Sequence, residues 1–275
     1  MKLALTYPCV MGICNITPDS FYDGGKHSTT TKALHHIETM VTQGADIIDI
    51  GAYSSRPGAI DISIDEEFSR LQPIIVEVRK HFPDILISID TFRSEIVTRV
   101  YHTIGNILVN DISGGMLDTA MLPTCGTLNV PYICMHMQGT PQTMHISPQY
   151  KNITQEIYTF FETQLIEAQK HGVPSVIIDP GFGFGKTIEH NFELLRTLDT
   201  YTSLDVPILV GLSRKSMIYK TLNTTPEQSL PGTIALNTLA LSKGASILRV
   251  HDVAEAVDVV TLYKKYGACI NSDTL

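Results

Sequence analysis

Short apolar runs rich in β-branched residues recur along the chain at a nearly even spacing, and a longer helix-like stretch follows each one. Continuous apolar strands that alternate with helices indicate an α/β protein whose parallel sheet is covered by helices on its outside. Eight such units close most naturally into a single (β/α)8 TIM barrel, whose usual size of about 250 residues suits this chain. An open, doubly wound sheet is the alternative. The expected strands are Cys9–Ile16, Asp46–Ile50, Ile85–Ile89, Ile107–Ile112, Tyr132–Met137, Val176–Asp179, Ile208–Leu212 and Ile247–His251.

Helix-like stretches fill the intervals, and several end at a glycine. Gly44, Gly172 and Gly244 stand where a left-handed residue would end a helix. No linker, low-complexity tract or further repeat interrupts the alternation, so we predict one domain over residues 1–275. The expected helices lie near Thr30–Gln43, Asp65–His81, Ser94–Thr103, Thr119–Gly126, Tyr150–His171, Thr187–Asp199, Thr233–Lys243 and Asp252–Tyr266.

The composition indicates a globular protein without a membrane or nucleic-acid partner. Hydrophobic residues make up 43% of the chain, enough for a large buried core. No apolar run approaches the roughly 18 residues of a membrane span, and Met1–Pro8 lacks a signal-peptide pattern, so we expect a cytoplasmic location. Five cysteines at spacings that match no zinc or redox motif are expected to be reduced thiols.

The charge distribution constrains the ligand. Against 28 acidic residues the chain has 20 Lys and Arg, a net charge of −8, and no stretch of five like charges. A nucleic-acid partner is therefore not expected. An anionic substrate would need a local cluster of cations that works against the net field.

Polar residues follow nearly every expected strand. A lone Asp after a strand is more often the N-cap of the next helix than a catalyst. Their occurrence at so many strand ends favours a site, because active sites of TIM barrels lie where the strands finish. Arg249 and His251 alternate across Val250 and so suggest an anion site, with surface solvation as the alternative. The strand-end residues are Asn15, Asp49, Asp90, Asn110, Asp111, His136, Asp179, Ser213, Lys215, Arg249 and His251.

Three loops contain residues that a simple connection between a strand and a helix does not need. The loop Asn15–Gly25 has two aromatic residues among turn residues, which suggests a lid. The loop Tyr53–Gly58 holds a serine pair and Arg56, suited to a phosphate, although it also fits an ordinary turn. The segment Gly211–Ser216 runs into an expected helix start, which could receive a carboxylate or phosphate.

The segment Pro180–Thr187 approaches a nucleotide-binding P-loop but misses it. Pro180 stands where the first glycine is required, and proline lacks the N–H that a phosphate cradle uses. ATP binding is therefore not expected. Phe182 and Phe184 suit an apolar wall beside an open pocket, with core packing as the alternative.

Seven short motifs, each weak alone, stand in one order along the chain. They are Met11–Phe21, Ile89–Thr91, Asn110–Gly115, Met135–Met137, Asp179–Lys186, Ser213–Ser216 and Arg249–His251. In these residues and their order, from about Met11 to Val257, the chain resembles the dihydropteroate synthase family. The resemblance implies a TIM barrel that joins 4-aminobenzoate to 6-hydroxymethyl-7,8-dihydropterin diphosphate, releases diphosphate and uses Mg²⁺. It also implies a homodimer, and sulfonamides as competitors of the aminobenzoate.

The resemblance implies a role for each matching residue. Pterin contacts are implied for Asp90, Asn110, Asp179, Phe184, Gly211, Lys215 and Arg249. Diphosphate contacts are implied for Asn15, Ser55, Arg56, Arg249 and His251, with Mg²⁺ on Asn15. Aminobenzoate contacts are implied for Phe21, Ser55, Pro57, Phe184 and Ser216. The catalytic set is Asp90, Lys215, Asn15 and Arg249.

The chemistry of a pterin agrees with these assignments. A pterin presents its N3–H and 2-amino group side by side, so a carboxylate such as Asp179 can accept both hydrogen bonds. Asn110 offers a donor and an acceptor to the neighbouring ring nitrogen and amino group. Because the methylene cation is conjugated with an electron-rich ring, the resemblance favours C–O cleavage before amine attack, with Asp90 stabilising the cation.

One segment departs from the family pattern. The family usually has Glu-Ser-Thr-Arg-Pro-Gly where this chain has Tyr53–Gly58. Ser55 keeps the hydroxyl of the family's threonine and loses a methyl group, and Tyr53 replaces a carboxylate. The change bears on substrate affinity and sulfonamide sensitivity, not on the type of reaction.

Two other functions would use part of the same residues. A methyltetrahydrofolate-handling methyltransferase resembles this family in Asp90, Asn110 and Asp179 but has no use for Lys215 or His251. A non-catalytic pterin-binding barrel predicts decay of the diphosphate and metal residues, which are complete in this chain.

Overall fold

The eight apolar runs lie in eight parallel strands of one sheet. The computed structural model describes residues 5–16, 25–54, 60–144 and 148–272, with only the backbone for residues 25–29 and 269–272. The strand order is β6-β5-β4-β3-β2-β1-β8-β7, and a bridge between Ile178 and Ile208 joins its two edges. The predicted TIM barrel is therefore confirmed. The strands are β1 Cys9–Asn15, β2 Ile47–Gly51, β3 Leu86–Asp90, β4 Leu108–Asp111, β5 Tyr132–Met135, β6 Val176–Asp179, β7 Leu209–Val210 and β8 Ile247–Val250.

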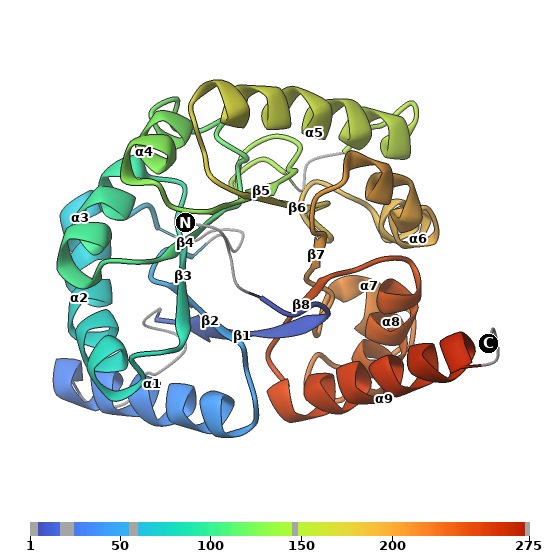
Figure 1. Ribbon diagram of the computed structural model, residues 1–275, viewed down its shortest axis with the longest axis horizontal. Coiled ribbons are helices and arrows are strands. Elements are labelled where there is room, and N and C mark those ends of the chain that lie inside the picture. Colours follow the sequence, from blue (N-terminus) through green and yellow to red (C-terminus); the bar gives the residue numbers. More distant parts are fainter. Residues whose placement is uncertain (1–4, 17–24, 55–59, 145–147, 273–275) are drawn as a thin grey trace.

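Helices surround the strands, as Figure 1 shows in a view along the barrel. They are α1 Gly25–Thr42, α2 Ile64–His81, α3 Ser94–Ile104, α4 Met121–Leu128, α5 Ile153–Lys170, α6 Ile188–Arg196, α7 Ser216–Tyr219, α8 Leu230–Ser242 and α9 Val253–Ser272, with a 3-10 helix η2 at Leu198–Leu204. The predicted left-handed helix ends are confirmed, because Gly44, Gly172 and Gly244 have φ angles of 97°, 73° and 94°. No helix among the described residues is long and apolar enough to cross a membrane.

Several helix boundaries differ from the expectation for local reasons. The helix expected from Tyr150 begins at Ile153, because the Asn152 side chain accepts the N–H of Gln155 and caps it there. The helix expected over Thr187–Asp199 changes to the tighter 3-10 form after Arg196. The helix start expected at Ser216 forms the single turn α7, and the helix expected from Thr233 begins at Leu230 in α8.

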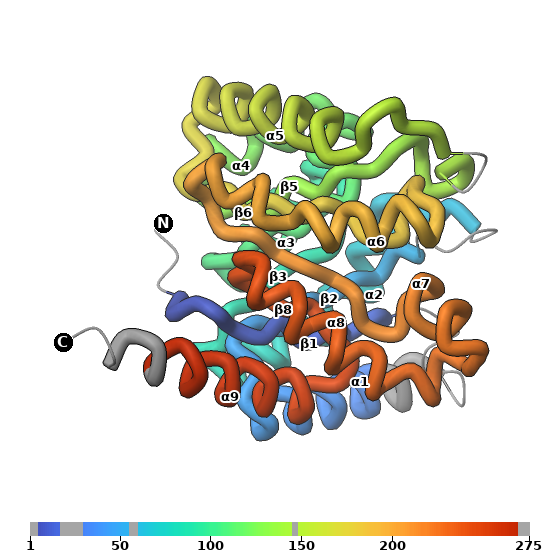
Figure 2. Tube along the Cα trace, turned by 90° about the vertical axis from the view of Figure 1, so that its right-hand side faces the viewer, coloured from blue at the N-terminus to red at the C-terminus, as the bar shows by residue number. Residues whose placement is uncertain are grey.

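Side-chain alternation along the strands divides the barrel interior into layers. Inward-facing apolar residues fill the barrel at one level, and the opposite faces of the strands pack against the helices. Because successive side chains alternate, the residue two positions further along each strand points to the same side. The next interior level therefore holds Asp49, Asn110, Asp179 and Arg249, two positions beyond Ile47, Leu108, Ile177 and Ile247. Figure 2 shows the barrel from the side, with α7 at the end where the strands finish. The apolar layer contains Cys9, Met11, Ile47, Leu108, Ile133, Ile177, Leu209 and Ile247.

Candidate active site

A network of charged side chains lies directly above the apolar layer. Arg249, from β8, donates to Asp49 Oδ2 through Nε at 2.7 Å. Its Nη2 donates to Asp90 Oδ2 at 2.8 Å. Asn110 Nδ2 donates to the same Asp49 oxygen at 3.0 Å. Four side chains from β2, β3, β4 and β8 are thereby joined into one network at the barrel mouth.

Burial shifts the charge equilibria of this network. It raises the pKa of Asp90, against the opposing effect of the Arg249 guanidinium. Burial alone would lower the pKa of Arg249, but Asp49 and Asp90 together raise it above its usual value, so the guanidinium stays charged. A permanent cation between two carboxylates gives the mouth a fixed pattern of donors and acceptors.

Asp179 and Lys215 form the other charged pair of the mouth. Burial raises the pKa of Asp179, and the neighbouring Lys215 is the main effect that opposes the rise. Burial lowers the pKa of Lys215 to about 8, with Asp179 opposing. The ammonium of Lys215 also lies 5.0 Å from the centre of the Phe184 ring. Lys215 therefore stands between a carboxylate and an aromatic face.

The loop after β6 is held by both of its neighbouring lysines. Lys215 Nζ donates to the carbonyl of Phe182. Lys186 Nζ donates to the carbonyls of Gly181 at 2.9 Å and Phe184 at 3.0 Å. Phe182 is fully buried, whereas Phe184 is only half-buried beside Lys215. Of the two aromatic residues expected to form a wall, Phe182 packs in the core and Phe184 borders the mouth.

Glycines allow this loop to come close to its neighbours. Gly181 has φ of 72°, and a Cβ there would lie 2.0 Å from the carbonyl oxygen of His136. Gly183 has φ of 81°, and a Cβ there would lie 3.2 Å from Cδ of Lys215. A side chain at Gly181 would displace backbone, whereas one at Gly183 would press on the Lys215 side chain.

The segment after β7 places Lys215 and links it to the end of β8. Ser213 Oγ accepts the backbone N–H of His251 at 3.2 Å and lies 3.1 Å from its ring Nδ1. Arg214 has φ of 56° and pairs through two hydrogen bonds with Asp252. The expected helix start at Ser216 is confirmed, but α7 has four residues, so its dipole is small.

The remaining predicted site residues divide into two groups. Asn15 ends β1 half-buried, and Gly211 follows β7, where a Cβ would lie 3.7 Å from Nζ of Lys215. The side-chain amide of Asn15 has no hydrogen-bond partner among the residues that the structure describes. Four predicted residues lie outside the described residues, namely Phe21, Ser55, Arg56 and Pro57.

Two strand-end residues, Asp111 and His136, contact other parts of the fold and take no part in the charged network. Asp111 accepts hydrogen bonds from the backbone of Ser113 and Gly115 and from the Tyr132 hydroxyl, as a turn cap does. His136 lies 3.1 Å from the ammonium of Lys186. Burial and Lys186 lower the pKa of His136 to about 2, so its ring is neutral.

Tyr53, which replaces the family's carboxylate, lies in an aromatic and cationic cluster. Its ring packs edge-to-face on Phe92 with centroids 4.9 Å apart, and the Arg93 guanidinium lies 5.1 Å from the Tyr53 ring. Arg93 in turn pairs with buried Glu67 at 2.9 Å and with Asp61 at 2.9 Å. The Tyr53 hydroxyl accepts a hydrogen bond from Gln142 Nε2 at 3.4 Å. Two carboxylates thus pair with Arg93, and Tyr53 adds its ring and its hydroxyl to the cluster.

Sequence reasoning named Asp49 as a strand-end residue and gave it no role. The structure places it at the centre of the network, fully buried, with hydrogen bonds from Asn110 and Arg249. Its inward position follows from Ile47 by strand alternation, which was a signal available in the sequence. The identity of its partners was not.

Comparison with known proteins agrees with this geometry. Residues 11–251 match the family described as pterin binding enzyme. The dihydropteroate synthase of Escherichia coli (strain K12) is 40% identical over 261 residues, covering 94% of this chain and 92% of the relative. That of Synechocystis is 45% identical over 247 residues, covering 89% and 85%.

Solved structures give the same result. A Yersinia pestis dihydropteroate synthase with a sulfonamide drug superposes with a TM-score of 0.90 at 38% identity, covering 98% of this chain and 97% of that one. The Xanthomonas albilineans enzyme with 4-aminobenzoic acid gives a TM-score of 0.87 at 38% identity, covering 95% and 94%. The closed barrel and its mouth thus define a pterin-binding enzyme. Within that class, the chain belongs to the dihydropteroate synthase family, transferases that make dihydropteroate in folate biosynthesis.

Proposed function

We propose that this barrel joins 4-aminobenzoate to 6-hydroxymethyl-7,8-dihydropterin diphosphate, forming 7,8-dihydropteroate and diphosphate. The observation that carries the proposal is the buried mouth network. In it Asp49 and Asp90 bind the Arg249 guanidinium and Asn110 donates to Asp49, beside Asp179 and Lys215. A flat heterocycle with donors along one edge and a carbonyl along another matches such a set of acceptors and cations.

The pterin ring is bound through its edges. Asp179 accepts the hydrogen bonds of N3–H and the 2-amino group, and Asn110 binds the adjacent ring nitrogen and the same amino group. Lys215 donates to the ring carbonyl and N5, leaving the Phe182 carbonyl that it contacts here. Arg249 covers the ring face, and Phe184 and Gly211 border it.

The reaction is a substitution at the methylene carbon. The C–O bond breaks first, and its electron pair leaves with the diphosphate. The cation left on the methylene is delocalised into the ring, where the carboxylate of Asp90 stabilises it. The amine of 4-aminobenzoate then donates its lone pair to form the C–N bond and loses a proton.

Two arginines supply positive charge for the leaving group. Arg249 and His251 lie at the end of β8, and Ser55 and Arg56 join them in the proposed site from outside the described residues. Burial and Arg249 lower the pKa of His251 to about 4, so its neutral ring binds the diphosphate through a hydrogen bond. Arg249 and Arg56 meet the requirement for local positive charge in a chain of net charge −8.

The residues present fit a magnesium ion shared with the substrate. Mg²⁺ prefers oxygen ligands and is usually held by one or two protein groups together with substrate phosphates. Asn15 offers an amide oxygen at the mouth without a hydrogen-bond partner among the described residues. When bound there, Mg²⁺ neutralises charge that develops on the departing diphosphate.

The aminobenzoate is placed beside the loop after β6. Phe184 and Ser216 border this side of the mouth, and the carboxylate rests at the Ser216 turn. Phe21, Ser55 and Pro57 complete the proposed pocket from outside the described residues.

A second copy of the chain is proposed to cover the α8 and α9 face. Leu239 and Leu262 are 52% and 71% exposed there, and Tyr266 is 67% exposed. Leu222, at 54% exposure, extends this face beyond the N-terminal end of α8, where it lies close to Gly232. Exposed large apolar side chains on two adjacent helices are typical of a protein interface.

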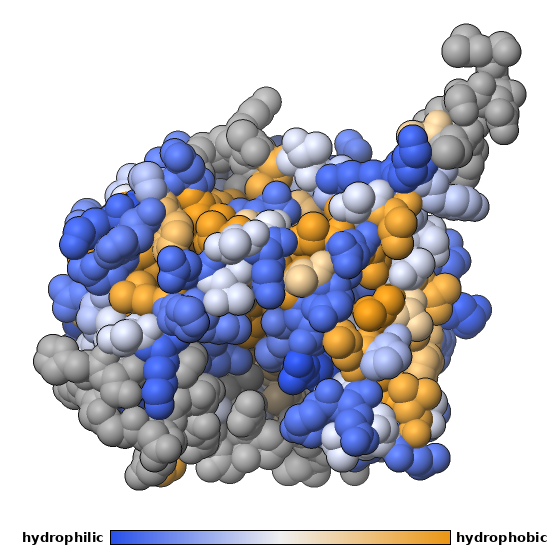
Figure 3. All heavy atoms as spheres, turned by 90° about the horizontal axis from the view of Figure 1, so that it is seen from below, coloured by the Kyte–Doolittle hydropathy of each residue, from blue (hydrophilic) through white to orange (hydrophobic). Residues whose placement is uncertain are grey.

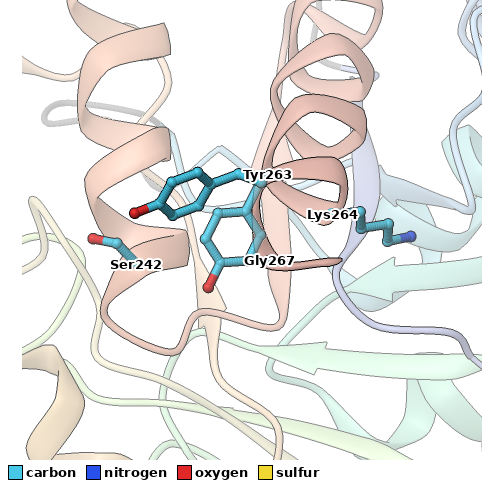
Figure 4. A pocket seen from close by; sticks show the side chains of 5 residues that line it. Ser242, Tyr263, Lys264 and Gly267 are labelled. Atoms are coloured by element: carbon cyan, nitrogen blue, oxygen red, sulfur yellow. The ribbon is translucent and has the colours of Figure 1, made fainter. Parts of the chain in front are cut away.

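The same face contains a shallow pocket between the two helices. It has a volume of about 380 Å³ and is lined by Ser242, Tyr263, Lys264, Tyr266 and Gly267. Figure 4 shows the Tyr263 ring pointing toward Ser242 and Lys264 pointing away. Figure 3 shows apolar side chains interspersed with polar ones on the face of the molecule seen from below. A homodimer would bury these aromatic rings.

An assay of diphosphate release tests the proposed reaction. We expect sustained release over many turnovers only when both substrates and Mg²⁺ are present, because C–O cleavage precedes amine attack and a first equivalent can leave without the amine. Sustained release at the same rate without 4-aminobenzoate would contradict the assignment of the second substrate.

A further inference from the structure

We propose that Asp49 is a positioning residue that fixes the orientation of the Asn110 amide and so selects a 2-amino-4-oxo pterin ring over a 2,4-dioxo ring. The inference rests on the proposed pterin placement, since Asn110 is the group through which Asp49 acts.

The contacts of Asp49 leave one arrangement for Asn110. Asp49 is fully buried, and its Oδ2 lies 2.6 Å from Arg249 Nη2 and 3.0 Å from Asn110 Nδ2. A carboxylate paired with a guanidinium accepts hydrogen bonds and donates none. The amide atom that faces Asp49 must therefore be the nitrogen, because an amide oxygen there would face a second oxygen.

This orientation determines what Asn110 offers to a ligand. An amide nitrogen has two hydrogens, and Asp49 takes one of them. The carbonyl oxygen and the second N–H remain, side by side, as an acceptor next to a donor. Asn110 is itself only 3% exposed, so water competes weakly for these groups.

The two ring types present opposite patterns to that pair. A 2-amino group beside an unprotonated ring nitrogen offers a donor next to an acceptor, which matches the fixed amide. A 2-oxo group beside a ring N–H offers an acceptor next to a donor, and would need the amide turned over. The turned amide would place its oxygen against Asp49, so the buried carboxylate disfavours the dioxo ring.

Arg249 holds Asp49 in place for this role. Both Nε and Nη2 of the guanidinium lie within 2.7 Å of Asp49 Oδ2, and Nη2 also reaches Asp90. Removing the carboxylate therefore affects Arg249 as well as Asn110. An effect through Arg249 changes affinity for both rings, whereas an effect through Asn110 changes the ratio between them.

The experiment measures that ratio by calorimetry with 6-hydroxymethylpterin and 6-hydroxymethyllumazine as probes. We expect the wild-type protein to bind the 2-amino ring at least about tenfold more tightly. In Asp49→Asn and Asp49→Ala, residue 49 no longer requires the nitrogen of the Asn110 amide to face it. The ratio of the two affinities should therefore fall at least about threefold. Ser88→Ala is the matched control, because Ser88 is a buried neighbour of Asp49 on β3 with no hydrogen-bond partner among the described residues.

A double-mutant cycle separates positioning from general structural damage. In an Asn110→Ala background, Asp49→Asn should leave the ratio unchanged, since the residue through which it acts is gone. Equal wild-type affinity for the two rings, an unchanged ratio in the Asp49 variants, or the same Asp49 effect without Asn110 would each overturn the inference. Failure of the wild type to bind either ring would instead overturn the proposed function.

Discussion

The ammonium nitrogen of Lys186 lies 3.1 Å from Nδ1 of His136, inside the loop that carries Phe184. The His136 ring is neutral, so Nδ1 can accept a hydrogen bond from the ammonium. Backbone carbonyls of Gly181, Phe184 and His136 are its other acceptors. A buried lysine that hydrogen-bonds to neutral groups thus holds the loop that borders the mouth.

Lys186→Met should alter how stability depends on pH. Burial lowers the pKa of Lys186 from its usual 10.5 to about 7 in the folded protein. Between these values the unfolded chain binds more protons at this site, so the free energy of unfolding rises with pH there. The variant lacks this titration and should show a smaller rise between pH 6.5 and 9 in denaturant unfolding. An equal rise, with exposed Lys220→Met as the control, would contradict the lowered pKa of Lys186.

Asp179→Asn should reduce pterin affinity at least tenfold, because an amide presents one acceptor where the ring needs two. Hydrogen bonds to a charged group contribute roughly 1.5–3 kcal/mol each. Asp179 Oδ1 also accepts the N–H of Gly181 at 2.8 Å, and the oxygen of Asn can keep that contact. Calorimetry on the folded variant checks the prediction, and unchanged affinity would remove Asp179 from the pterin site.

Asn15→Ala should lose Mg²⁺-dependent turnover and still bind the bare pterin. The proposed ring contacts come from β3, β4, β6 and β8, whereas Asn15 ends β1. Turnover across a Mg²⁺ titration and binding of 6-hydroxymethylpterin by calorimetry are the two measurements. Full Mg²⁺-dependent turnover in the variant would leave Asn15 with a structural role.

Lys215→Ala and Ser216→Ala should have separate effects. Lys215 lies against Phe184 and near Asp179, so its loss should impair the use of both substrates. Ser216 begins α7, and its loss should raise the KM for 4-aminobenzoate with little change in pterin affinity. Steady-state kinetics with each substrate varied in turn checks the split. Small losses of stability with unchanged KM values in both variants would show that Lys215 and Ser216 serve only to cap α7.

Leu239→Arg should convert a dimer to a monomer. Leu239 lies exposed on α8 within the proposed contact face, and a charged side chain there would have to lose water on association. Sedimentation or light scattering measures the mass, with Ile166→Arg on the exposed side of α5 as the control. A monomeric wild-type protein would rule out the dimer. A Leu239→Arg variant that stays dimeric would place the interface elsewhere.

Local patterns in the sequence predicted most of the barrel. Apolar runs such as Val176–Asp179 identify strands because burial on both faces of a parallel strand leaves few polar positions. Helix ends at Gly44 and Gly244 were also predictable, because a left-handed residue is a local conformational requirement. The start of α5 at Ile153 was missed, although Asn152 is an ordinary N-cap.

The position of the candidate site at the strand ends was also predictable from a local pattern, the alternation of side chains along each strand. Asp179, Asn110 and Arg249 each stand two residues beyond an inward apolar residue of their strand, and a period of two keeps them inside the barrel. The sequence by itself therefore determined which side chains reach the mouth.

Only the tertiary structure decided which of these side chains meet. Asp49 is separated from Asn110 by 61 residues and from Arg249 by 200, and their contacts depend on strand register and barrel closure. Lys186 is 50 residues from His136, and Phe182 and Phe184 differ in burial although both stand between glycines. Periodicity specifies the direction of a side chain along its own strand. Partners across the barrel are specified by packing among all eight strands, which no local pattern contains.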